Sequence, residues 1–223
     1  KVRCEYDRNW SFKNIQTIAC SKGEYEITKE LTSNATYVDN GINLKEFDGI
    51  NMDHQTNFDH LKIATLGRIS LQKNPVMFNR IAEAFPNIDF IWIGDGELRD
   101  KLTTPNIKIT GWVDNKTALN YLADTDIFIL TSLWEGLPMA LLEAMYMKKI
   151  CIVSDVVGNR DVIHDEQNGY ICDSVNDFIK KVKSISTDRL MLPELIKKAH
   201  DDVVNHYNST VMANEYKKIY TIK

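Results

Sequence analysis

Short apolar runs alternate with longer helical segments over most of this 223-residue chain. Each run has the length of a strand, and the stretch that follows it shows helical periodicity. The expected strands are residues 63–66, 89–93, 107–109, 127–131, 150–153 and 169–172, and the expected helices are 75–85, 116–123, 138–147 and 175–185. Alternation of this kind produces a mostly parallel sheet with helices on both faces. The sequence therefore predicts an α/β fold with a doubly wound, mostly parallel sheet.

A different pattern precedes this sheet. Residues 15–19 are typical of a strand, Ser21 and Glu24 form a capping box for a helix to about Leu31, and a second strand is expected around Tyr37. The polar, turn-rich residues 47–60 then separate this opening segment from the main pattern. Two closing helices are expected at 193–207 and 209–220. The chain starts at Lys1, inside an element, which suggests a fragment of a longer protein.

Composition limits the class of protein. The hydrophobic content of 43% is enough for a substantial core, and the net charge of −4 argues against nucleic acid as a partner. No signal peptide and no apolar run long enough for a membrane span is evident. The scattered cysteines, which are Cys4, Cys20, Cys151 and Cys172, indicate reduced, buried thiols in a cytoplasmic protein. Lysine doublets such as Lys148-Lys149 are expected on the solvated surface.

In a doubly wound sheet, ligands bind beyond the carboxyl ends of the strands. Four unusual loops are expected there: Gly67-Arg68 with Lys73, Gly94-Asp95-Gly96, Gly111-Trp112-Val113, and Glu135 to Pro138. Arg68 and Lys73 could neutralise a diphosphate, Arg68 by its planar fork and Lys73 as a point charge. Together these loops suit a phosphate ester that carries hydroxyl groups.

The last loop leads into a helix that is apolar on every side except for Glu143. Pro138 has the character of a first helical residue, so the free N–H groups of Gly136, Leu137, Met139 and Ala140 form an anion site. A buried carboxylate is costly unless something hydrogen bonds to it, so Glu143 requires a partner. A ribose diol is one such partner, and Glu135 would then face the group attached to the phosphates. A nucleotide sugar fits all these roles.

These motifs resemble the C-terminal domain of the glycosyltransferase family four enzymes, which are retaining and have the GT-B fold. The resemblance rests on Leu66-Gly-Arg68 with Lys73, Ile93 to Glu97, Gly111 to Val113, the Glu-x7-Glu spacing of Glu135 and Glu143, and Val153 to Arg160. It runs from about Ser21 to Tyr220. Leu137, Pro138 and Asp161 depart from the commoner family pattern, which leaves the sugar specificity open.

The resemblance implies a role for each matching residue. Arg68 and Lys73, close to Gly67, would hold the donor diphosphate, the backbone near Val113 would meet the base, Glu143 would bind the ribose, and Glu135 would contact the donor sugar. Arg68, Lys73 and Glu135 are therefore the expected catalytic residues. No metal and no cofactor is expected, because the nucleotide sugar is itself the substrate.

The resemblance also implies a domain organisation. Residues 1–45 would end an N-terminal acceptor domain, 46–207 would form the nucleotide-sugar domain, and 208–223 would form a helix that packs back on the acceptor domain. Such a chain is expected to bind donor and to transfer little sugar by itself. A glycan or lipid-linked acceptor of bacterial surface polysaccharide or glycolipid synthesis is expected, with the full enzyme working in the cytoplasm or at the inner face of the membrane.

Simpler interpretations of single residues remain open. Arg68 and Lys73 could be surface cations beside a turn, Glu135 and Glu143 could pair with a lysine such as Lys148, and Gly94 to Gly96 could be only a tight turn. Asp124-Thr-Asp126 precedes its strand, at the end opposite the ligand loops, so we interpret it as a turn and not as a metal motif. None of the five histidines has metal-ligand spacing.

Other classes of protein also remain. A nucleotide-dependent oxidoreductase would require a third glycine after Gly94-Asp-Gly96, where Arg99 stands instead. A non-catalytic nucleotide-binding or partner-binding module would keep its interaction when Arg68, Lys73 or Glu143 is replaced. A sugar epimerase or phosphorylase of the same fold would carry motifs that this chain does not show.

Overall fold

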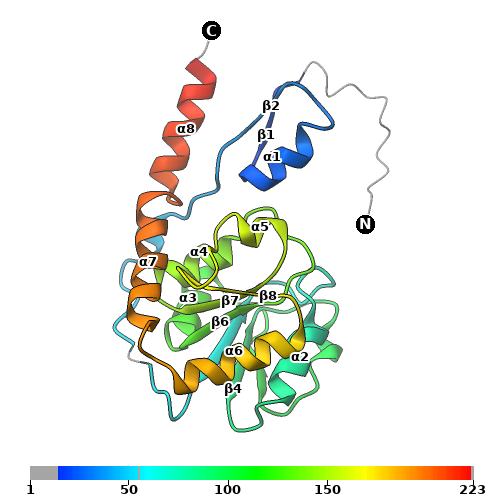
Figure 1. Cartoon of the computed structure of the whole chain (residues 1–223), viewed down its shortest axis with the longest axis vertical. Helices are drawn as coiled ribbons and strands as arrows, with labels where there is room; N and C mark the ends of the chain where they lie inside the picture. The colour runs from blue at the N-terminus through cyan, green and yellow to red at the C-terminus, as the bar shows by residue number, and fades with distance from the viewer. Residues whose placement is uncertain (1–14, 55, 222–223) are drawn as a thin grey trace.

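The computed structural model describes residues 15–54 and 56–221. Its main sheet has six parallel strands in the order β5-β4-β3-β6-β7-β8 (Figure 1). The strands are β3 (Lys62–Leu66), β4 (Asp89–Ile93), β5 (Ile107–Ile109), β6 (Ile127–Leu130), β7 (Ile150–Ser154) and β8 (Tyr170–Cys172). The predicted doubly wound parallel sheet is confirmed, and each expected strand lies within two residues of its observed bounds.

Helices cover both faces of this sheet. The covering elements are α2 (Pro75–Glu83), α3 (Asn115–Ala123), α4 (Met139–Tyr146), α6 (Val175–Thr187) and α7 (Leu192–Asn205). Successive residues of a strand point to opposite faces. In β6, Ile127 and Ile129 pack with α2 and α6, whereas Phe128 and Leu130 pack with α3, α4 and α7. A strand buried on both faces must be apolar throughout, which explains the continuous apolar runs in the sequence.

Side-chain caps fix where several helices begin. Asn74, in the left-handed region at φ 51°, accepts a hydrogen bond from Met77 N at the start of α2. Asp114 caps α3 in the same way. Pro138 was expected to be the first residue of a helix, but it precedes α4, because its ψ of 114° is extended. Helix α4 therefore begins at Met139.

A small unit precedes the main sheet and lies against its carboxyl edge (Figure 1). It consists of β1 (Thr17–Ala19), α1 (Lys22–Thr28) and β2 (Ala35–Tyr37), with the two strands paired in parallel. Ser21 Oγ accepts a hydrogen bond from Glu24 N, and the Glu24 carboxylate accepts one from Cys20 N. The expected cap is confirmed, and α1 ends three residues before the expected Leu31.

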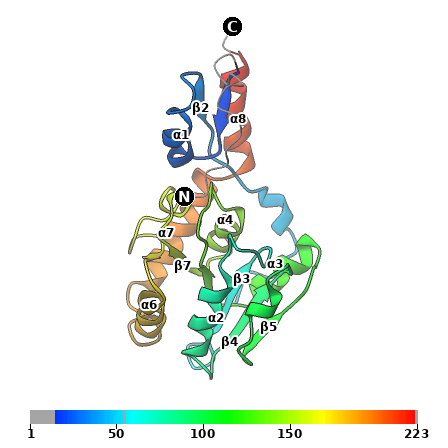
Figure 2. The ribbon, with the colours of Figure 1, turned by 90° about the vertical axis from the view of Figure 1, so that its right-hand side faces the viewer.

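Two chain segments meet beside the main sheet. The first holds the short 3-10 helix η2 (Leu44–Phe47), and the second joins α7 to α8 (Ser209–Thr221). They are paired, because Ile42 N donates to Tyr207 O at 2.9 Å and Ser209 N donates to Ile42 O at 2.8 Å. Helix α8 extends away from the main sheet and buries no residue (Figure 2). A further 3-10 helix, η3 (Arg99–Lys101), follows β4.

Lys149 corrects the expectation that the lysine doublets are solvated. Its ammonium is buried and donates to Ala123 O and Thr125 O, both at 2.7 Å. Burial lowers the pKa of Lys149 to about 8. The group lies at the amino end of β7, where it satisfies carbonyls that the end of α3 leaves free. Its neighbour Lys148 is exposed, so adjacent residues of one doublet have opposite environments.

Two of the four cysteines match the expected buried, free state, and Cys20 departs from it in burial. Cys151 and Cys172 are free and buried, while Cys20 is free but only half-buried. Cys4 lies outside the described residues. Over the described range, no helix combines the length and apolar character that a membrane span requires.

Candidate donor site

Glycines allow the loops at the carboxyl edge of the sheet to pack against one another. Gly94 has φ 136°, and a Cβ there would lie 2.3 Å from Gly67 O. A Cβ on Gly96 would lie 2.3 Å from Ile69 O. Such approaches are open only to glycine, so the structural interpretation of the Gly94 turn is confirmed. This packing fixes the backbone that carries Arg68 and Lys73.

The central contact of the site is an ion pair between Lys73 and Glu135. Lys73 Nζ lies 2.6 Å from Glu135 Oε1, and the two side chains are 17% and 6% exposed. Ser132 Oγ donates to the same carboxylate oxygen at 2.6 Å, and Thr131 Oγ1 donates to Lys73 O at 2.8 Å. Buried carboxylates need such partners. The structure therefore joins two sequence-predicted site residues directly, and Lys148 is not the partner of Glu135.

Arg68 takes a different position from Lys73. Its guanidinium pairs with Glu97 at 3.1 Å, and both side chains are more than half exposed. An exposed pair of this kind is worth about 0–1 kcal/mol, so an anion can displace it. Asp95 pairs with Arg99 at 2.8 Å and accepts a hydrogen bond from Gly96 N. Asp95 therefore holds the turn, as expected.

The loop before α4 presents free backbone donors. Among the described residues, no group accepts a hydrogen bond from the N–H of Gly136, Met139 or Ala140. The free N–H groups at a helix start attract anions. Helix α5 (Val157–Arg160) supports this loop closely, since a Cβ on Gly158 would lie 2.2 Å from Gly136 O. The loop is thus held in one conformation.

Cys20 of the small unit faces the same loop. A Cβ on Gly136 would lie 2.9 Å from Cys20 Sγ, and Asn40 Nδ2 donates to Leu137 O at 3.4 Å. Burial and the Glu24 carboxylate raise the pKa of Cys20 to about 12, although a hydrogen bond from the backbone of Leu137 opposes this. The thiol is therefore neutral. Of the four N–H groups that were expected to bind an anion, the one of Leu137 already donates to Cys20.

Glu143 lies inside the site without a protein partner. In the described part of the chain, no residue donates a hydrogen bond to its half-buried carboxylate or forms an ion pair with it. Burial, with a smaller contribution from the Glu46 carboxylate, raises its pKa to about 7. A partly buried carboxyl with a strongly raised pKa is a functional-site candidate. The partner that the sequence required for Glu143 is not supplied by the described protein.

The loop after β5 forms the remaining side. Val113 is half-buried against the core that contains α4, while the Trp112 side chain is 70% exposed. Asn115, the first residue of α3, donates from Nδ2 to Glu46 Oε2 at 2.7 Å. Sequence analysis missed Glu46, which lies on η2, directly before the linker expected at residues 47–60. It also missed two hydrogen-bond partners of Glu135. Gln72 donates from Nε2 to Glu135 Oε2 at 3.4 Å from 63 residues away, and Ser132 lies only three residues before Glu135.

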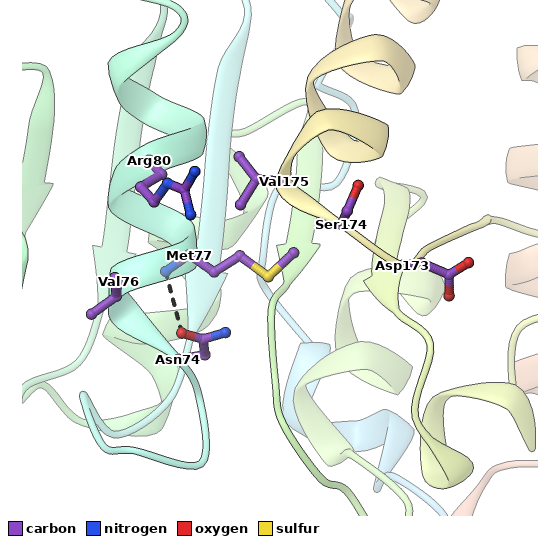
Figure 3. Close-up of a pocket in the computed structure, with 7 residues that line it drawn as sticks. All are labelled: Asn74, Val76, Met77, Arg80, Asp173, Ser174 and Val175. Atoms are coloured by element: carbon purple, nitrogen blue, oxygen red, sulfur yellow. Dashed lines mark hydrogen bonds between the residues drawn. The ribbon is translucent and has the colours of Figure 1, made fainter.

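A separate groove lies beside α2 (Figure 3). It has a volume of about 280 Å³ and opens between the first turns of α2 and α6. Its lining residues are Asn74, Val76, Met77, Arg80, Asp173, Ser174 and Val175. None of the sequence-predicted site residues lines it, so the groove is distinct from the candidate donor site.

Asp124 and Asp126 have structural partners at the opposite edge of the sheet. Asp126 accepts hydrogen bonds from Lys62 N and His54 Nε2, both at 2.8 Å, and Asp124 pairs with Lys62 Nζ at 2.6 Å. Within the described ranges, no group of three or more His, Cys, Asp or Glu side chains could hold a metal ion. Both aspartates therefore act in joining β3 to β6.

Comparison with known proteins identifies the class to which this fold and site belong. A family model described as "Glycosyl transferases group 1" matches residues 61–188, which is more than half of the chain. The chain belongs to this glycosyltransferase family. The resemblance drawn from the sequence motifs is thereby confirmed, and the oxidoreductase alternative is set aside.

Individual relatives agree with this assignment. The chain is 30% identical to an Escherichia coli UDP-Gal:alpha-D-GlcNAc-diphosphoundecaprenol alpha-1,3-galactosyltransferase over 86% of this chain and 57% of that protein. The Anabaena protein Alr3699/HepE, solved in complex with UDP and glucose, matches with a TM-score of 0.78 at 13% identity, covering 92% of this chain and 62% of that one. The C-terminal domain of a group 1 glycosyl transferase from Francisella tularensis matches with a TM-score of 0.58 at 22% identity, covering 67% and 87%. The chain thus spans a little over half the length of its E. coli relative.

Proposed function

We propose that this chain is the donor-binding part of a retaining glycosyltransferase that uses a nucleoside-diphosphate sugar. The observation that carries the proposal is Glu143, a half-buried carboxylate with no partner among the described residues, next to the free N–H groups at the start of α4. A carboxylate only accepts hydrogen bonds, and a ribose diol supplies two donors. The acidic residue of dinucleotide folds binds ribose in this way.

The diphosphate would lie between Lys73, Arg68 and the loop before α4. Lys73 uses one of its three donors on Glu135, which leaves the others for a phosphate oxygen. Arg68 can exchange its exposed partner Glu97 for a phosphate. The free N–H groups of Gly136, Met139 and Ala140 would complete the site. With these cations and donors in place, no essential metal or cofactor is expected.

Catalysis would be mainly electrostatic. As the bond to the sugar breaks, negative charge develops on the departing nucleoside diphosphate, and Arg68, Lys73 and the start of α4 would stabilise it. Glu135 would face the donor sugar while it remains paired with Lys73. We infer retention at the anomeric carbon from the family resemblance of the Glu135 and Glu143 spacing.

The acceptor would bind mainly to another domain. We assign residues 1–45 to the end of an N-terminal acceptor domain, 46–207 to the donor domain, and 208–223 to a helix that packs back on the acceptor domain. The solved Francisella C-terminal domain has the same fold over 67% of this chain, which is compatible with a separate donor domain. The E. coli relative acts on a diphosphoundecaprenol-linked sugar, so we propose a lipid-linked or glycan acceptor at the inner face of the membrane.

Calorimetric titration tests donor binding. The chain would be titrated with UDP, GDP, ADP, dTDP and their common sugar conjugates, with magnesium and with EDTA. We expect saturable binding of one nucleotide that is insensitive to metal and about 10- to 100-fold weaker in Glu143→Ala. Glu83→Gln, which changes an exposed glutamate at the far end of α2, is the matched control. Absence of binding by a folded chain would contradict the proposal.

A transfer assay tests the division of labour between domains. The chain and a longer protein that adds an N-terminal acceptor domain would be compared with labelled donor and a lipid-linked acceptor. We expect transfer only by the longer protein, and α-configured product from an α-configured donor. Transfer by the present chain alone, or an inverted product, would contradict this part of the proposal.

A further inference from the structure

Glu46 lies on η2, in the segment that leads into the main sheet, and is held at the candidate donor site. Its neighbour Phe47 is 4% exposed and packs edge-on against Tyr146, with 4.6 Å between ring centroids. Tyr146 lies on α4, one turn after Glu143. The buried Phe47 ring therefore anchors η2 against α4 and fixes the position from which Glu46 extends.

The Glu46 carboxylate reaches the first residue of α3. Its Oε2 accepts a hydrogen bond from Asn115 Nδ2 at 2.7 Å. Asn115 is the first residue of α3 and comes two residues after Val113, whose backbone would meet the base. Since helices in this fold start at the carboxyl edge of the sheet, Glu46 lies at the same edge as the other site residues. The side chain thus bridges η2 and the first residue of α3.

Glu46 and Glu143 are both acceptor groups without a cation. Neither forms an ion pair within the described part of the chain, and their mutual repulsion contributes to the raised pKa of Glu143. Two neighbouring carboxylates are unfavourable unless donors lie between them. A ribose diol would satisfy Glu143. The second oxygen of Glu46 then remains available to a donor on the attached base.

We propose that Glu46 is a specificity-determining residue that accepts a hydrogen bond from the ring N–H of the nucleotide base. This inference rests on the proposed binding of a nucleoside-diphosphate sugar. Uracil and guanine carry a ring N–H on their pairing edge, whereas cytosine and adenine present a lone pair there. A lone pair facing a carboxylate is repelled and leaves the acceptor unsatisfied, and sites built to hydrogen bond reject such analogues strongly. Glu46 therefore favours UDP or GDP over CDP or ADP.

Two matched nucleotide pairs test this selection. UDP would be compared with CDP, and GDP with ADP, by calorimetric titration of the chain. In whichever pair binds, we expect the member with the ring N–H to bind at least about tenfold more tightly. We expect Glu46→Gln and Glu46→Ala to reduce this preference to about threefold or less, mainly by weakening the preferred nucleotide. Glu46 is exposed, so neither variant should disturb folding, and circular dichroism would verify this.

The controls separate this inference from the proposed function. Glu83→Gln removes an exposed carboxylate far from the site and should keep the preference of the wild type. If the wild type binds nucleotide and the Glu46 variants discriminate as it does, Glu46 does not select the base, while donor binding stands. A wild-type preference for CDP or ADP would also overturn the inference. If no nucleotide binds the folded chain, both the inference and the proposed function fail.

Discussion

Lys73 and Glu135 form the most constrained pair of the site. Their charged atoms are 2.6 Å apart and largely removed from water, so removal of one charge leaves the other uncompensated. Sequence analysis gave each residue a separate ligand contact. The pairing adds a structural role, because the ion pair also fixes the loop before α4 against α2.

This pairing predicts strongly non-additive effects on stability. We expect Lys73→Met to lower the free energy of unfolding by about 2–4 kcal/mol, because Glu135 loses its cation. Addition of Glu135→Gln should restore about 1–3 kcal/mol of this loss. Urea denaturation of the wild type, both single variants and the double variant measures the coupling. Lys62→Met, which breaks the more exposed pair with Asp124, should cost less than about 1 kcal/mol.

Additivity of the two substitutions would show that the pair is not coupled. A cost for Lys62→Met as large as that for Lys73→Met would show that burial does not distinguish the two pairs.

The raised pKa of Glu143 predicts that the free energy of unfolding decreases as the pH rises. Its pKa is raised from the ordinary 4.5 to about 7, so the folded state favours the protonated carboxyl. The free energy of unfolding therefore has its full value below about pH 4.5, where the carboxyl is protonated in both states. It falls as the pH rises through about 7. Relative to Glu143→Gln, the wild type should lose on the order of 2–3 kcal/mol between pH 4.5 and pH 8. Urea denaturation of both proteins across this range measures the difference.

Glu83→Gln is the control, because this exposed side chain should show no comparable change with pH. A constant difference between wild type and Glu143→Gln from pH 4.5 to pH 8 would mean that Glu143 is already hydrogen bonded in the folded chain.

At the scale of elements, α5 supports the loop that leads into α4. A Cβ on Gly158 would lie 2.2 Å from Gly136 O, and backbone atoms cannot yield as a flexible side chain does. We expect Gly158→Ala to move the loop and to weaken nucleotide binding about tenfold or more, since displacements near 1 Å misplace binding donors. Calorimetric titration measures the change.

Gly49→Ala provides a contrast to Gly158→Ala. Gly49 has φ 78° with nothing within 4 Å of an added Cβ, so its substitution strains the backbone without contacting the site. It should cost about 1 kcal/mol of stability and leave nucleotide affinity unchanged. Equal affinities of the Gly158→Ala variant and the wild type would show that the loop tolerates the displacement.

For the whole molecule, α7 and α8 differ in what they contribute. Helix α7 packs on α4 and buries Ala199 and Val203 completely, whereas α8 buries no residue. We expect truncation after Val211 to change the free energy of unfolding by less than about 1 kcal/mol. Truncation after Lys198 removes both buried side chains and should cost more than about 3 kcal/mol. Thermal and urea denaturation of the two truncated chains provide the comparison.

A large loss on truncation after Val211 would show that α8 stabilises the donor domain directly. That result would also weaken the proposal that this helix serves the acceptor domain.

The sequence by itself determined the architecture and the location of the site. Alternation of apolar runs with helical segments specifies a parallel sheet, because each pattern is local and repeats along the chain. Caps such as Asn74 and Asp114 act within one helical turn and can be recognised without tertiary contacts. Since parallel strands bring their following loops to one edge, the set of loops around Lys73, Glu135 and Glu143 could also be predicted.

Only the tertiary structure decided which of these groups meet. Lys73 and Glu135 are 62 residues apart, and Glu46 and Asn115 are 69 apart, so no local pattern relates them. Lys149 is buried while Lys148 is exposed, because the fold places only the Lys149 ammonium next to the carbonyls of Ala123 and Thr125. Local propensity acts over a few residues, whereas burial and pairing depend on how crossovers fold distant segments together. The partnerless Glu143 could be suspected from its apolar helix, but only the folded chain showed that no described residue satisfies it.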